Sequence, residues 1–466
     1  MNFNSPEFLF FLPGALFLYA VCFRSATVRN VCLLVISYAF YMSWNWKYAG
    51  LLACATVVDY SVGLLLAREY PSSWRKAILT TSLTWNIGLL AVFKYFNFFV
   101  DLGEPVATVL GIDVAPLRHH LLLPVGISFY TFQTMSYTID LYRDRSLVER
   151  NFLKFSVFVA FFPQLIAGPI VRANQFLPQL QTTPRVSEDG VHAGLCLVFR
   201  GLFKKVVLAD LLANLAVDEV FARPADFSSW DLLLALYGYT FQIYNDFSGY
   251  SDIAIGLAKI LGFQLPTNFD RPYLSQNIRE FWTRWHITLS TWLRDYLYIP
   301  LGGNRGGAFR VGINLVTTML LGGLWHGASL HFVAWGLWHG LWLVLGRSGP
   351  RVPPEVPWYI KALKQIQCFH VIVFGWLLFR VQDWQGFVLY MKGFAKMTMG
   401  TQLHPLFYSV LGLAIVIHVV PKSYVDKVLV RLTFMPIPAQ ACVYACLLLF
   451  FCGLTLEAPS FIYFQF

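Results

Sequence analysis

His326 is the residue whose type and position most clearly predict chemistry. It follows the apolar stretch 320–325 and precedes three small residues, Gly327, Ala328 and Ser329. An ionisable side chain inside a membrane helix is costly and is by default a candidate functional group. The small residues would let a substrate or another backbone approach the imidazole. The alternative is a neutral histidine that donates to a carbonyl and holds two helices together, and the spacing alone does not decide between the two.

A second histidine, His286, lies in the polar, tryptophan-rich stretch 279–295. If this stretch is one helix, Trp282, His286, Leu289 and Leu293 share a face. Charged residues in the same stretch exclude contact with lipid tails and favour an interfacial or cavity-edge helix. They are Arg279, Glu280, Arg284, Arg294 and Asp295. The alternative is an amphipathic surface helix whose histidine meets lipid headgroups.

The five-residue word Gly-Leu-Trp-His-Gly occurs twice, at 323–327 and at 336–340. His339 in the second copy is therefore a rival to His326 for any catalytic role. No matched halves of the kind that many transporters show accompany this short repeat.

A third polar cluster lies at 242–252, in what the apolar pattern predicts to be a break between two helices. Its carboxylates and hydroxyls, Asp246, Ser248 and Asp252 among them, could line a substrate path. They could also form a capping network, with Ser251 as the N-cap of a helix that begins near Asp252. The strip 124–130, continued by Gln133, is a second kinked polar segment.

These residues suit acyl transfer. A neutral histidine can deprotonate a hydroxyl that attacks a thioester or an ester. There is no Gly-x-Ser-x-Gly elbow, phosphate-binding loop or His-Glu-x-x-His helix in the sequence. The pair His119-His120 has no nearby third ligand, and the eight cysteines form no Cys-x-x-Cys pair, so we expect neither a metal site nor a disulfide framework.

The composition shows what must position these residues. The 466 residues are 57% hydrophobic, 17% aromatic and only 13% charged, and several apolar stretches approach the roughly 20 residues needed to cross a bilayer. This predicts an all-α polytopic membrane protein and excludes a β-barrel, a disordered chain and a nucleic-acid-binding domain. The formal charge of +10 is then attributed to loops that face anionic lipid.

Hydropathy and loop charge predict the organisation of a single domain, 1–466, with ten to twelve membrane segments. Basic residues cluster near 24–29, 68–76 and 143–150, in every second loop, which places these loops in the cytoplasm and the N-terminus outside. Prolines interrupt 160–180, which we interpret as a re-entrant segment enclosed by protein. The predicted spans in the first part of the chain are 6–23, 30–43, 48–67, 77–99 and 121–141. Later apolar runs lie near 190–217, 229–245, 250–262, 310–328, 331–347, 366–380, 405–420 and 436–455.

With these motifs the sequence resembles the membrane-bound O-acyltransferase family, and most closely its bacterial branch of alginate O-acetyltransferase membrane proteins. The motif core covers about 120–345. The matching words are Pro124–Gln133, Ile166–Ile170, Asp246–Asp252, Asn268–Tyr273, Phe281–Ser290, Tyr298–Arg305, Gly323–Ala328 and the ending Phe461–Phe466.

The resemblance implies a ring of membrane helices around a thin centre, where a funnel from each side meets the active histidine. The family's catalytic histidine corresponds to His326, and its second characteristic position corresponds to His286. His339 matches a histidine that is common in this branch. We rank His326 first because Gly327, Ala328 and Ser329 match the family's word better than the residues after His339 do.

The resemblance also implies transfer of an acyl group, usually acetyl, from a cytoplasmic donor such as acetyl-coenzyme A or an acyl-carrier thioester. The expected acceptor is a periplasmic, esterase-like O-acetyltransferase that decorates an exopolysaccharide such as alginate or cellulose. Relatives serve peptidoglycan acetylation and teichoic-acid D-alanylation. Expected partners are that transferase, the machinery of polysaccharide synthesis and export, and lipids of a bacterial inner membrane, but no nucleic acid and no tightly bound cofactor.

We therefore predict His326 as the general base and His286 as the residue that positions the donor or hydrogen-bonds its carbonyl oxygen. Predicted substrate-binding residues are Asp246, Ser248, Asp252, Arg284, Trp325, His339 and Gln133. A negatively charged donor is expected to dock on the arginines near His286, with lipid contact as the alternative. They are Arg271, Arg279, Arg284, Arg294, Arg305 and Arg310. A transporter with proton-relaying histidines, or a scaffold for polysaccharide export, remains the rival class.

Overall fold

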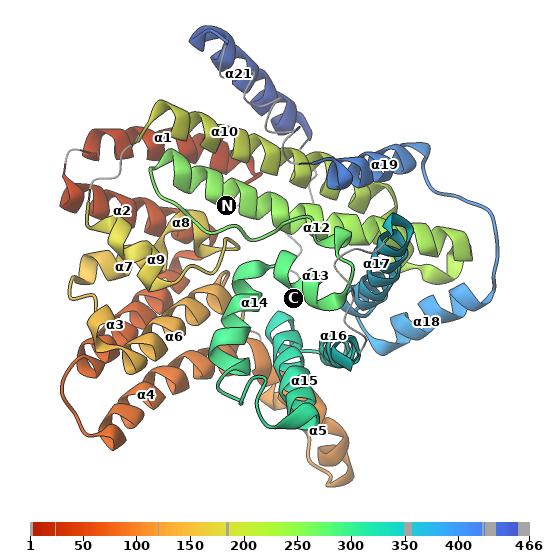
Figure 1. Ribbon diagram of the computed structural model, residues 1–466, viewed down its shortest axis with the longest axis horizontal. Helices are drawn as coiled ribbons and strands as arrows, with labels where there is room; N and C mark the ends of the chain where they lie inside the picture. Colours follow the sequence, from red (N-terminus) through yellow and green to blue (C-terminus); the bar gives the residue numbers. More distant parts are fainter. Residues whose placement is uncertain are drawn as a thin grey trace.

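The computed structural model describes residues 3–23, 25–119, 121–182, 186–348, 357–421, 424 and 435–454, which form helices joined by loops (Figure 1). Within these ranges there is no β-strand, and the predicted all-α class is confirmed. The positive-inside pattern also predicts that most of 421–431 faces the cytoplasm. Most of this segment and the family-like ending 461–466 lie outside the described residues. Figure 1 shows the short helices α13 (Ile278–Arg284) and α14 (Ile287–Leu293) near the middle of the molecule, with longer helices around them.

The first part of the chain forms seven helices, most of them on the left of Figure 1, with α5 at the bottom of the picture below α15 (Gly307–His326). These are α1 (Pro6–Cys22), α2 (Ala26–Asn45), α3 (Ala49–Leu66), α4 (Ser72–Leu90), α5 (Phe96–Val109), α6 (Ile127–Arg143) and α7 (Phe152–Ala160). Two boundaries differ from prediction. A π-helical turn, η2 (Ala91–Tyr95), joins α4 to α5, so the helix continues to Val109. Arg29 is not a loop residue, because it is buried in α2 and donates to the carbonyls of Leu180 and Thr182.

The segment after α7 is broken, as its prolines predict, into α8 (Phe162–Leu165), α9 (Ala173–Phe176) and the 3₁₀ turn η5 (Leu177–Leu180). Its side chains are almost all buried in protein. Hydroxyl groups replace the missing helical partners: Phe162 N donates to Ser37 Oγ at 3.1 Å, and Ile170 N donates to Thr288 Oγ1 at 3.0 Å. Irregular backbone is thus enclosed and satisfied by protein.

The middle of the chain is dominated by α12 (Ser229–Ile260), which crosses the centre of Figure 1 beside α10 (Glu188–Leu202). Between them the chain forms the π-helical segments η6 (Phe203–Asp210) and η7 (Ala213–Val217) and the short α11 (Asp218–Ala222). The predicted break at 242–252 is wrong, because α12 is continuous. The polar side chains in this part of α12 are buried, and several find partners on neighbouring elements, so they do not interrupt the helix. Ser251 lies inside α12 and is not an N-cap.

Glycines bring α10 and α12 into close contact. A Cβ at Gly201 would lie 2.5 Å from the carbonyl oxygen of Gly249, and a Cβ at Gly194 would lie 2.7 Å from that of Gly256. Each helix therefore carries two glycines seven residues apart along the contact. Small residues at such positions let two helix backbones approach closely, which sets the spacing of Arg200 and Asp252, the charged residues that lie between the paired glycines.

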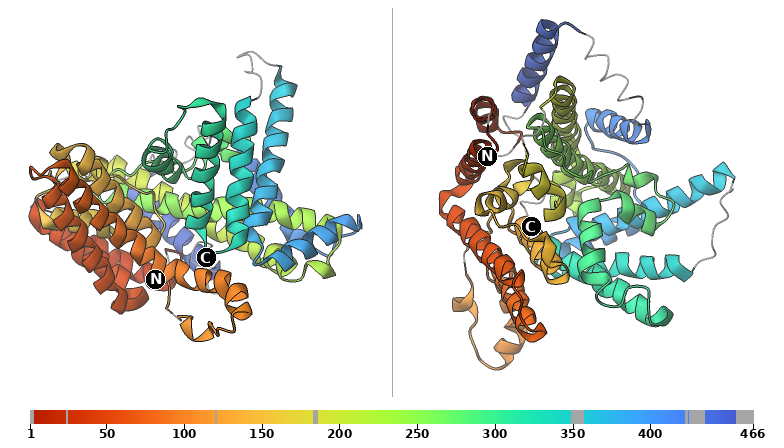
Figure 2. Two further views of the ribbon diagram at one scale, coloured as in Figure 1. Left: turned by 90° about the horizontal axis from the view of Figure 1, so that it is seen from below. Right: turned by 60° about the vertical axis from the view of Figure 1, so that its left-hand side comes forward.

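The last part of the chain begins with the 3₁₀ turn η9 (Pro272–Leu274) and ends with α21 (Ile437–Leu454). Between them lie α13 (Ile278–Arg284), α14 (Ile287–Leu293), the π-helical η10 (Arg294–Tyr298), α15 (Gly307–His326), α16 (Leu330–Ser348), α17 (Trp358–Arg380), α18 (Trp384–Ala395) and α19 (Pro405–Val419). Figure 2 shows that α15, α16 and α17 stand side by side.

The repeated word explains the packing of α15 on α16. A Cβ at Gly323, the first residue of one copy, would lie 2.2 Å from Phe332 O and 3.3 Å from the Cα of Gly336, the first residue of the other copy. A Cβ at Gly336 would in turn lie 2.4 Å from Met319 O. Both initial glycines therefore serve the contact between the two helices.

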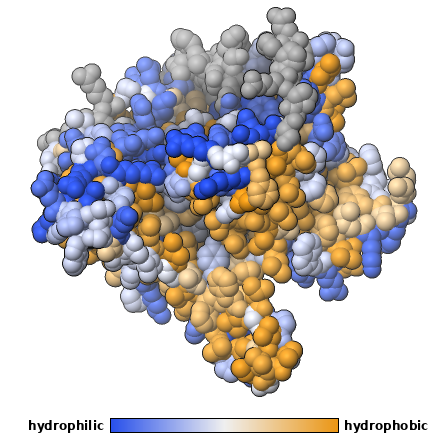
Figure 3. Space-filling view, turned by 60° about the horizontal axis from the view of Figure 1, so that its bottom comes forward, coloured by the Kyte–Doolittle hydropathy of each residue, from blue (hydrophilic) through white to orange (hydrophobic). Residues whose placement is uncertain are grey.

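Among the described residues, four helical stretches are long and apolar enough to cross a membrane, namely Ala26–Leu66, Ser72–Val109, Gly307–His326 and Trp358–Arg380. Figure 3 shows a broad hydrophobic area below a band of hydrophilic side chains on one face. Two of the three predicted basic segments, 68–76 and 143–150, lie close together, since Arg75 donates to the carbonyls of Leu141 and Tyr142, and Tyr60 donates to that of Arg150. These features define a multi-pass membrane protein.

Candidate active site

His326 is the last residue of α15, and its side chain is 4% exposed. Its ring is enclosed by aromatic side chains, with centroids 5.0 Å away at Trp325, 5.0 Å at Trp335 and 5.2 Å at Phe379. The next residue, Gly327, has an extended backbone and ends the helix. A Cβ at Gly327 would lie 2.0 Å from the Phe332 ring. Gly327 was predicted to leave room for a substrate or another backbone, and in the structure it leaves room for the Phe332 side chain of α16.

His286 lies between α13 and α14, with a left-handed backbone at φ 40°. The single amphipathic helix predicted for 279–295 is therefore wrong. The backbone turns at Trp285 and His286, because two backbone hydrogen bonds join the residues on either side of the turn to the segment 268–270. Asp270 N donates to Arg284 O at 2.9 Å, and Ile287 N donates to Asn268 O at 2.9 Å. The turn directs the fully buried imidazole into the protein and not toward headgroups.

The Asn268 amide determines which nitrogen of His286 carries the proton. Asn268 Oδ1 accepts from Thr288 N at 3.2 Å and from Thr288 Oγ1 at 2.9 Å, and it lies 3.1 Å from His286 Nδ1. An amide oxygen only accepts, so His286 Nδ1 donates. In the neutral ring Nε2 then has a free lone pair, and this atom has no hydrogen-bond partner among the described residues.

Trp325 lies between the two histidines. Its ring centroid is 6.0 Å from that of His286 and 5.0 Å from that of His326. Phe129 and Phe132 of α6 hold the other side of the indole, at 5.6 and 5.4 Å. The buried indole N–H has no partner within the described ranges. The site thus combines a buried donor, the indole N–H of Trp325, and a buried acceptor, Nε2 of His286, with the imidazole of His326.

His339 has different surroundings, although its sequence context repeats that of His326. It lies within α16, against Phe281, Trp282 and Trp335 at centroid distances of 6.1, 5.2 and 4.8 Å. A Cβ at Gly375 of α17 would come within 2.7 Å of His339 Nε2, so this edge of the ring is closed by backbone. Neither ring nitrogen has a partner in the described part of the chain, and the contacts are those of a packing residue.

Three of the other predicted substrate-binding residues lie in separate polar networks. Gln133 Nε2 donates to Phe158 O at 2.7 Å, at the end of α7. Asp246 forms an ion pair of 2.7 Å with the buried Lys205, which also pairs with Asp210. Arg284 pairs with Glu280 at 2.9 Å and lies 3.9 Å from Asp270. Ser248 is buried in α12.

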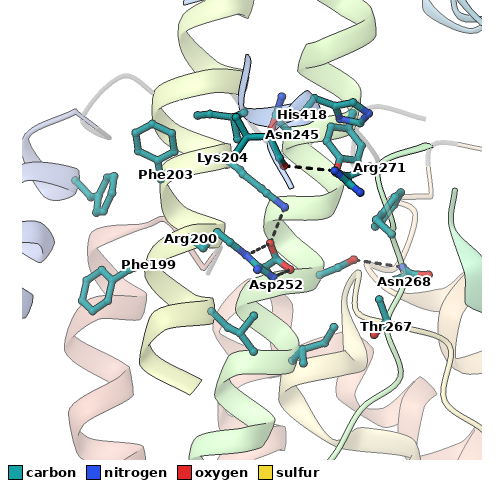
Figure 4. Close-up of a pocket in the computed structure, with 18 of the residues that line it drawn as sticks. Phe199, Arg200, Phe203, Lys204, Asn245, Asp252, Thr267, Asn268, Arg271 and His418 are labelled. Atoms are coloured by element: carbon teal, nitrogen blue, oxygen red, sulfur yellow. Dashed lines mark hydrogen bonds and ion pairs between the residues drawn. The ribbon is translucent and has the colours of Figure 1, made fainter. Parts of the chain in front are cut away.

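Asp252 lies in a pocket of about 540 Å³ between α10, α12, α19 and α21 (Figure 4). Arg200 binds both of its oxygens at 2.8 and 3.0 Å, and Lys204 binds one of them at 2.7 Å. Arg271 lines the opposite wall and donates to the carbonyl of Val419 at 3.3 Å. Three cations against one carboxylate give this part of the pocket an excess of positive charge.

Asn268 connects this pocket with the histidines. It lines the pocket, donates to Ser251 Oγ at 3.3 Å and accepts from His286. Figure 4 shows Asn268 and Thr267 on one wall, facing Asp252 and Arg200. Of the arginines predicted to dock a donor, Arg271 is in the pocket, whereas Arg284 and Arg294 are engaged by Glu280 and Asp295.

Sequence reasoning missed Asn268 and Lys94. Lys94 Nζ, from the π-helical turn η2, donates to the carbonyl oxygens of Trp325 at 2.6 Å and His326 at 2.9 Å. A lysine in the apolar stretch 77–99 was the available signal, since such residues are functional candidates by default. Among the described residues, no group of three His, Cys, Asp or Glu side chains could hold a metal ion.

The fold is that of a multi-pass helical membrane protein with two buried histidines around one indole. Residues 39–348 match the family model of the membrane-bound O-acyltransferases. The chain therefore belongs to the membrane-bound O-acyltransferase family and is an O-acyltransferase, which confirms the resemblance seen in its motifs.

The chain is also similar to individual proteins whose activities have been named. The chain is 44% identical over 389 residues to a probable alginate O-acetylase of Azotobacter vinelandii, covering 82% of this chain and 76% of the relative. It is 35% identical over 426 residues to a peptidoglycan O-acetyltransferase of Helicobacter pylori, covering 84% and 79%. It is 29% identical over 331 residues to a teichoic acid D-alanyltransferase of Bacillus subtilis, covering 63% and 82%.

Proposed function

We propose that this protein transfers an acetyl group from a cytoplasmic thioester, acetyl-coenzyme A or an acyl-carrier protein, for O-acetylation of an exopolysaccharide such as alginate or cellulose. The observation that carries the proposal is the buried arrangement of His286, Trp325 and His326. The 44% identity to probable alginate O-acetylases supports the choice of polymer. An esterase-like periplasmic transferase is the proposed partner, which passes the acetyl group on, together with the machinery that synthesises and exports the polymer.

In the proposed reaction His326 is the general base. Its neutral imidazole takes the proton of the acceptor hydroxyl while the hydroxyl oxygen attacks the thioester carbonyl carbon. The C–S bond then breaks, and the departing thiolate takes the proton from the imidazolium. A positioned base of this kind contributes about 10²–10⁴-fold in rate. Enclosure by Trp325, Trp335 and Phe379 keeps competing water from the ring.

His286 and Trp325 have complementary parts in this proposal. With Nδ1 donating to Asn268, neutral His286 can accept but not donate at Nε2, so donation to the thioester oxygen, as the sequence predicted, would need the protonated ring. We assign Nε2 to an N–H or O–H of the bound substrates. The indole N–H of Trp325 is then the donor available to the negative charge that develops on the thioester oxygen.

The pocket beside Asn268 is the proposed entry of the donor. Arg200, Lys204 and Arg271 offer positive charge to its phosphate groups. Aromatic and aliphatic side chains form the remaining walls, which suits a pantetheine arm. The proposed location is the inner membrane, with the N-terminus in the periplasm and the basic loops in the cytoplasm.

A second acceptor, peptidoglycan, has support from the relative in Helicobacter pylori, which is a peptidoglycan O-acetyltransferase. Deletion of the gene followed by analysis of O-acetyl groups separates the two acceptors. Loss of acetyl from an exopolysaccharide supports the first proposal, and loss from peptidoglycan alone supports the second.

The rival class, a transporter of polar solutes, is tested with purified protein in vesicles and labelled acetyl-coenzyme A. Label transferred to acceptor, or released by slow hydrolysis, supports an acyltransferase that uses this donor. Solute flux without loss of the thioester contradicts the proposal.

A further inference from the structure

The end of α15 that carries His326 is held by a lysine from a distant part of the chain. The last four carbonyls of an α-helix have no partner within the helix. Lys94 Nζ donates to two of them, Trp325 O at 2.6 Å and His326 O at 2.9 Å. These carbonyls belong to the two peptide units that flank the Cα of His326. Fixing both units fixes the direction in which the imidazole leaves the backbone.

The neighbouring residue makes a comparable contact without a charge. Tyr95 OH donates to Leu324 O, on the same turn of α15, at 2.9 Å. Gly327 N donates weakly to Gly323 O at 3.4 Å. Tyrosine thus shows that an uncharged donor is sufficient to satisfy a carbonyl at this helix end.

Lys94 reaches this position from η2, the π-helical turn Ala91–Tyr95. Such turns are rare within α-helices and are frequent at functional sites. An ammonium in a membrane-embedded, half-buried position is also expensive. Polar uncharged groups can satisfy the carbonyls at a helix end, so this purpose needs neither the π-helical turn nor the ammonium of Lys94. Both features therefore indicate that Lys94 serves the chemistry of the active site.

The charge has a direct electrostatic consequence. A cation at the C-terminal end of a helix interacts favourably with the negative end of the helix dipole. Here it offsets that negative potential next to His326. If the thioester is bound beside His326, as the proposed function requires, the carbonyls of α15 without the ammonium would disfavour the negative charge that the thioester oxygen acquires.

We propose that Lys94 is a positioning residue for His326, which orients the imidazole through the two flanking peptide units and offsets the negative potential at the end of α15. The proposal rests on the proposed function of His326. It assigns to the π-helical turn of η2 the role of delivering this ammonium.

The test compares four variants of the full-length protein in one acyl-transfer assay. Lys94→Met removes the charge and the donors, Lys94→Gln keeps an N–H donor without charge, and Lys94→Arg keeps both. Tyr95→Phe is the matched control, because it removes an uncharged bond to the same helix end. We expect Lys94→Met and Lys94→Gln to lower kcat at least about tenfold with donor KM changed less than about twofold. Lys94→Arg should recover most of kcat, and Tyr95→Phe should lower it less than about threefold.

Three results would overturn the proposal. The first is a kcat of Lys94→Met near that of the wild type. The second is a kcat of Lys94→Gln equal to that of Lys94→Arg. The third is a loss of kcat and of melting temperature in Lys94→Met that equals the loss in Tyr95→Phe. If Lys94→Met does not fold, the comparison of Lys94→Gln with Lys94→Arg decides. His326→Ala in the same assay separates the failures: if it remains active, the proposed role of His326 as general base is wrong, whereas an inactive His326→Ala beside fully active Lys94 variants refutes only the role of Lys94.

Discussion

The two copies of Gly-Leu-Trp-His-Gly place chemically equal residues in unequal surroundings. Trp338 in the second copy donates its indole N–H to Val371 O at 2.9 Å, and His339 faces the backbone of Gly375. The indole N–H of Trp325 in the first copy has no such partner among the described residues. The ring of Trp325 contacts both His286 and His326. A buried donor without a protein partner calls for an explanation such as a ligand.

This contrast gives a prediction for Trp325. Trp325→Phe keeps an aromatic ring between the histidines but removes the N–H, so we expect kcat to fall about 10²-fold, as for loss of one oxyanion donor. Trp376→Phe is the control, because Trp376 is equally buried and its N–H also lacks a described partner, but its ring contacts Trp285 and Trp335 and not His326 or His286. Steady-state kinetics of both variants measure the effect. Equal rates for the two would contradict the assignment.

At this scale the sequence predicted His326, His286 and Trp325 because each stands in a distinctive local word. It could not predict Asn268 or Lys94 as members of the site. Both act through contacts with residues far away in the chain. Asn268 opens the family-like word Asn268–Tyr273, which assigns it no role, and Lys94 is marked only by its charge within an apolar run. Asp246 and Arg284 were predicted for substrate on their charge, but they pair with Lys205 and Glu280.

The helices that build the site are held together by glycines. The contact of α10 with α12 sets Arg200 and Lys204 opposite Asp252, and the contact of α15 with α16 holds His326 against Trp335. In lipid such close backbone approach replaces the hydrophobic driving force that packs helices in water.

Gly201→Ala tests this packing. Its Cβ would meet the carbonyl of Gly249 at 2.5 Å, and overpacking typically costs about 1–3 kcal/mol. We expect a lower melting temperature in detergent and a raised donor KM, since α10 must move away from α12 and so displace Arg200 and Lys204 from Asp252. Gly88→Ala is the matched control: it is also helical, but its Cβ meets nothing within 4 Å. A Gly201→Ala variant as stable and as active as Gly88→Ala would refute the packing argument.

Element boundaries show where local patterns are insufficient. The apolar runs correctly located α1, α2, α3, α15, α16 and α19. The polar residues at 242–252 suggested a break, but partners on other elements satisfy much of this polar part of α12. Conversely, periodicity suggested one helix through His286, where contacts with Asn268 impose a turn. Both errors arise from tertiary hydrogen bonds that a single segment does not reveal.

Over the whole molecule, two of the three basic segments, 68–76 and 143–150, lie close together, as the contacts of Arg75 with 141–142 show. The side of the membrane on which these segments lie is a prediction from the charge pattern. The overall class followed from composition alone, because so few charged residues cannot cover a water-soluble surface of this size.

Labelling of single cysteines tests the orientation. Asp113→Cys and Lys76→Cys, each in a background without the native cysteines, replace exposed residues at opposite ends of the long helix 72–109. A membrane-impermeant thiol reagent added to intact spheroplasts should label position 113 and leave position 76 unlabelled until the membrane is opened. Labelling of position 76 alone would invert the orientation, and labelling of both would refute a span between them.

The most direct measurement is acyl transfer by purified His326→Ala and His339→Ala, with labelled acetyl-coenzyme A and with melting temperature measured in parallel. The account predicts that His326→Ala folds normally but loses transfer by about 10²–10⁴-fold, the contribution of a general base. It predicts that His339→Ala melts at a lower temperature and retains transfer per folded molecule, because its ring only fills space between α13, α16 and α17. A well-folded, inactive His339→Ala beside an active His326→Ala would contradict the account and assign catalysis to the other copy of the repeated word.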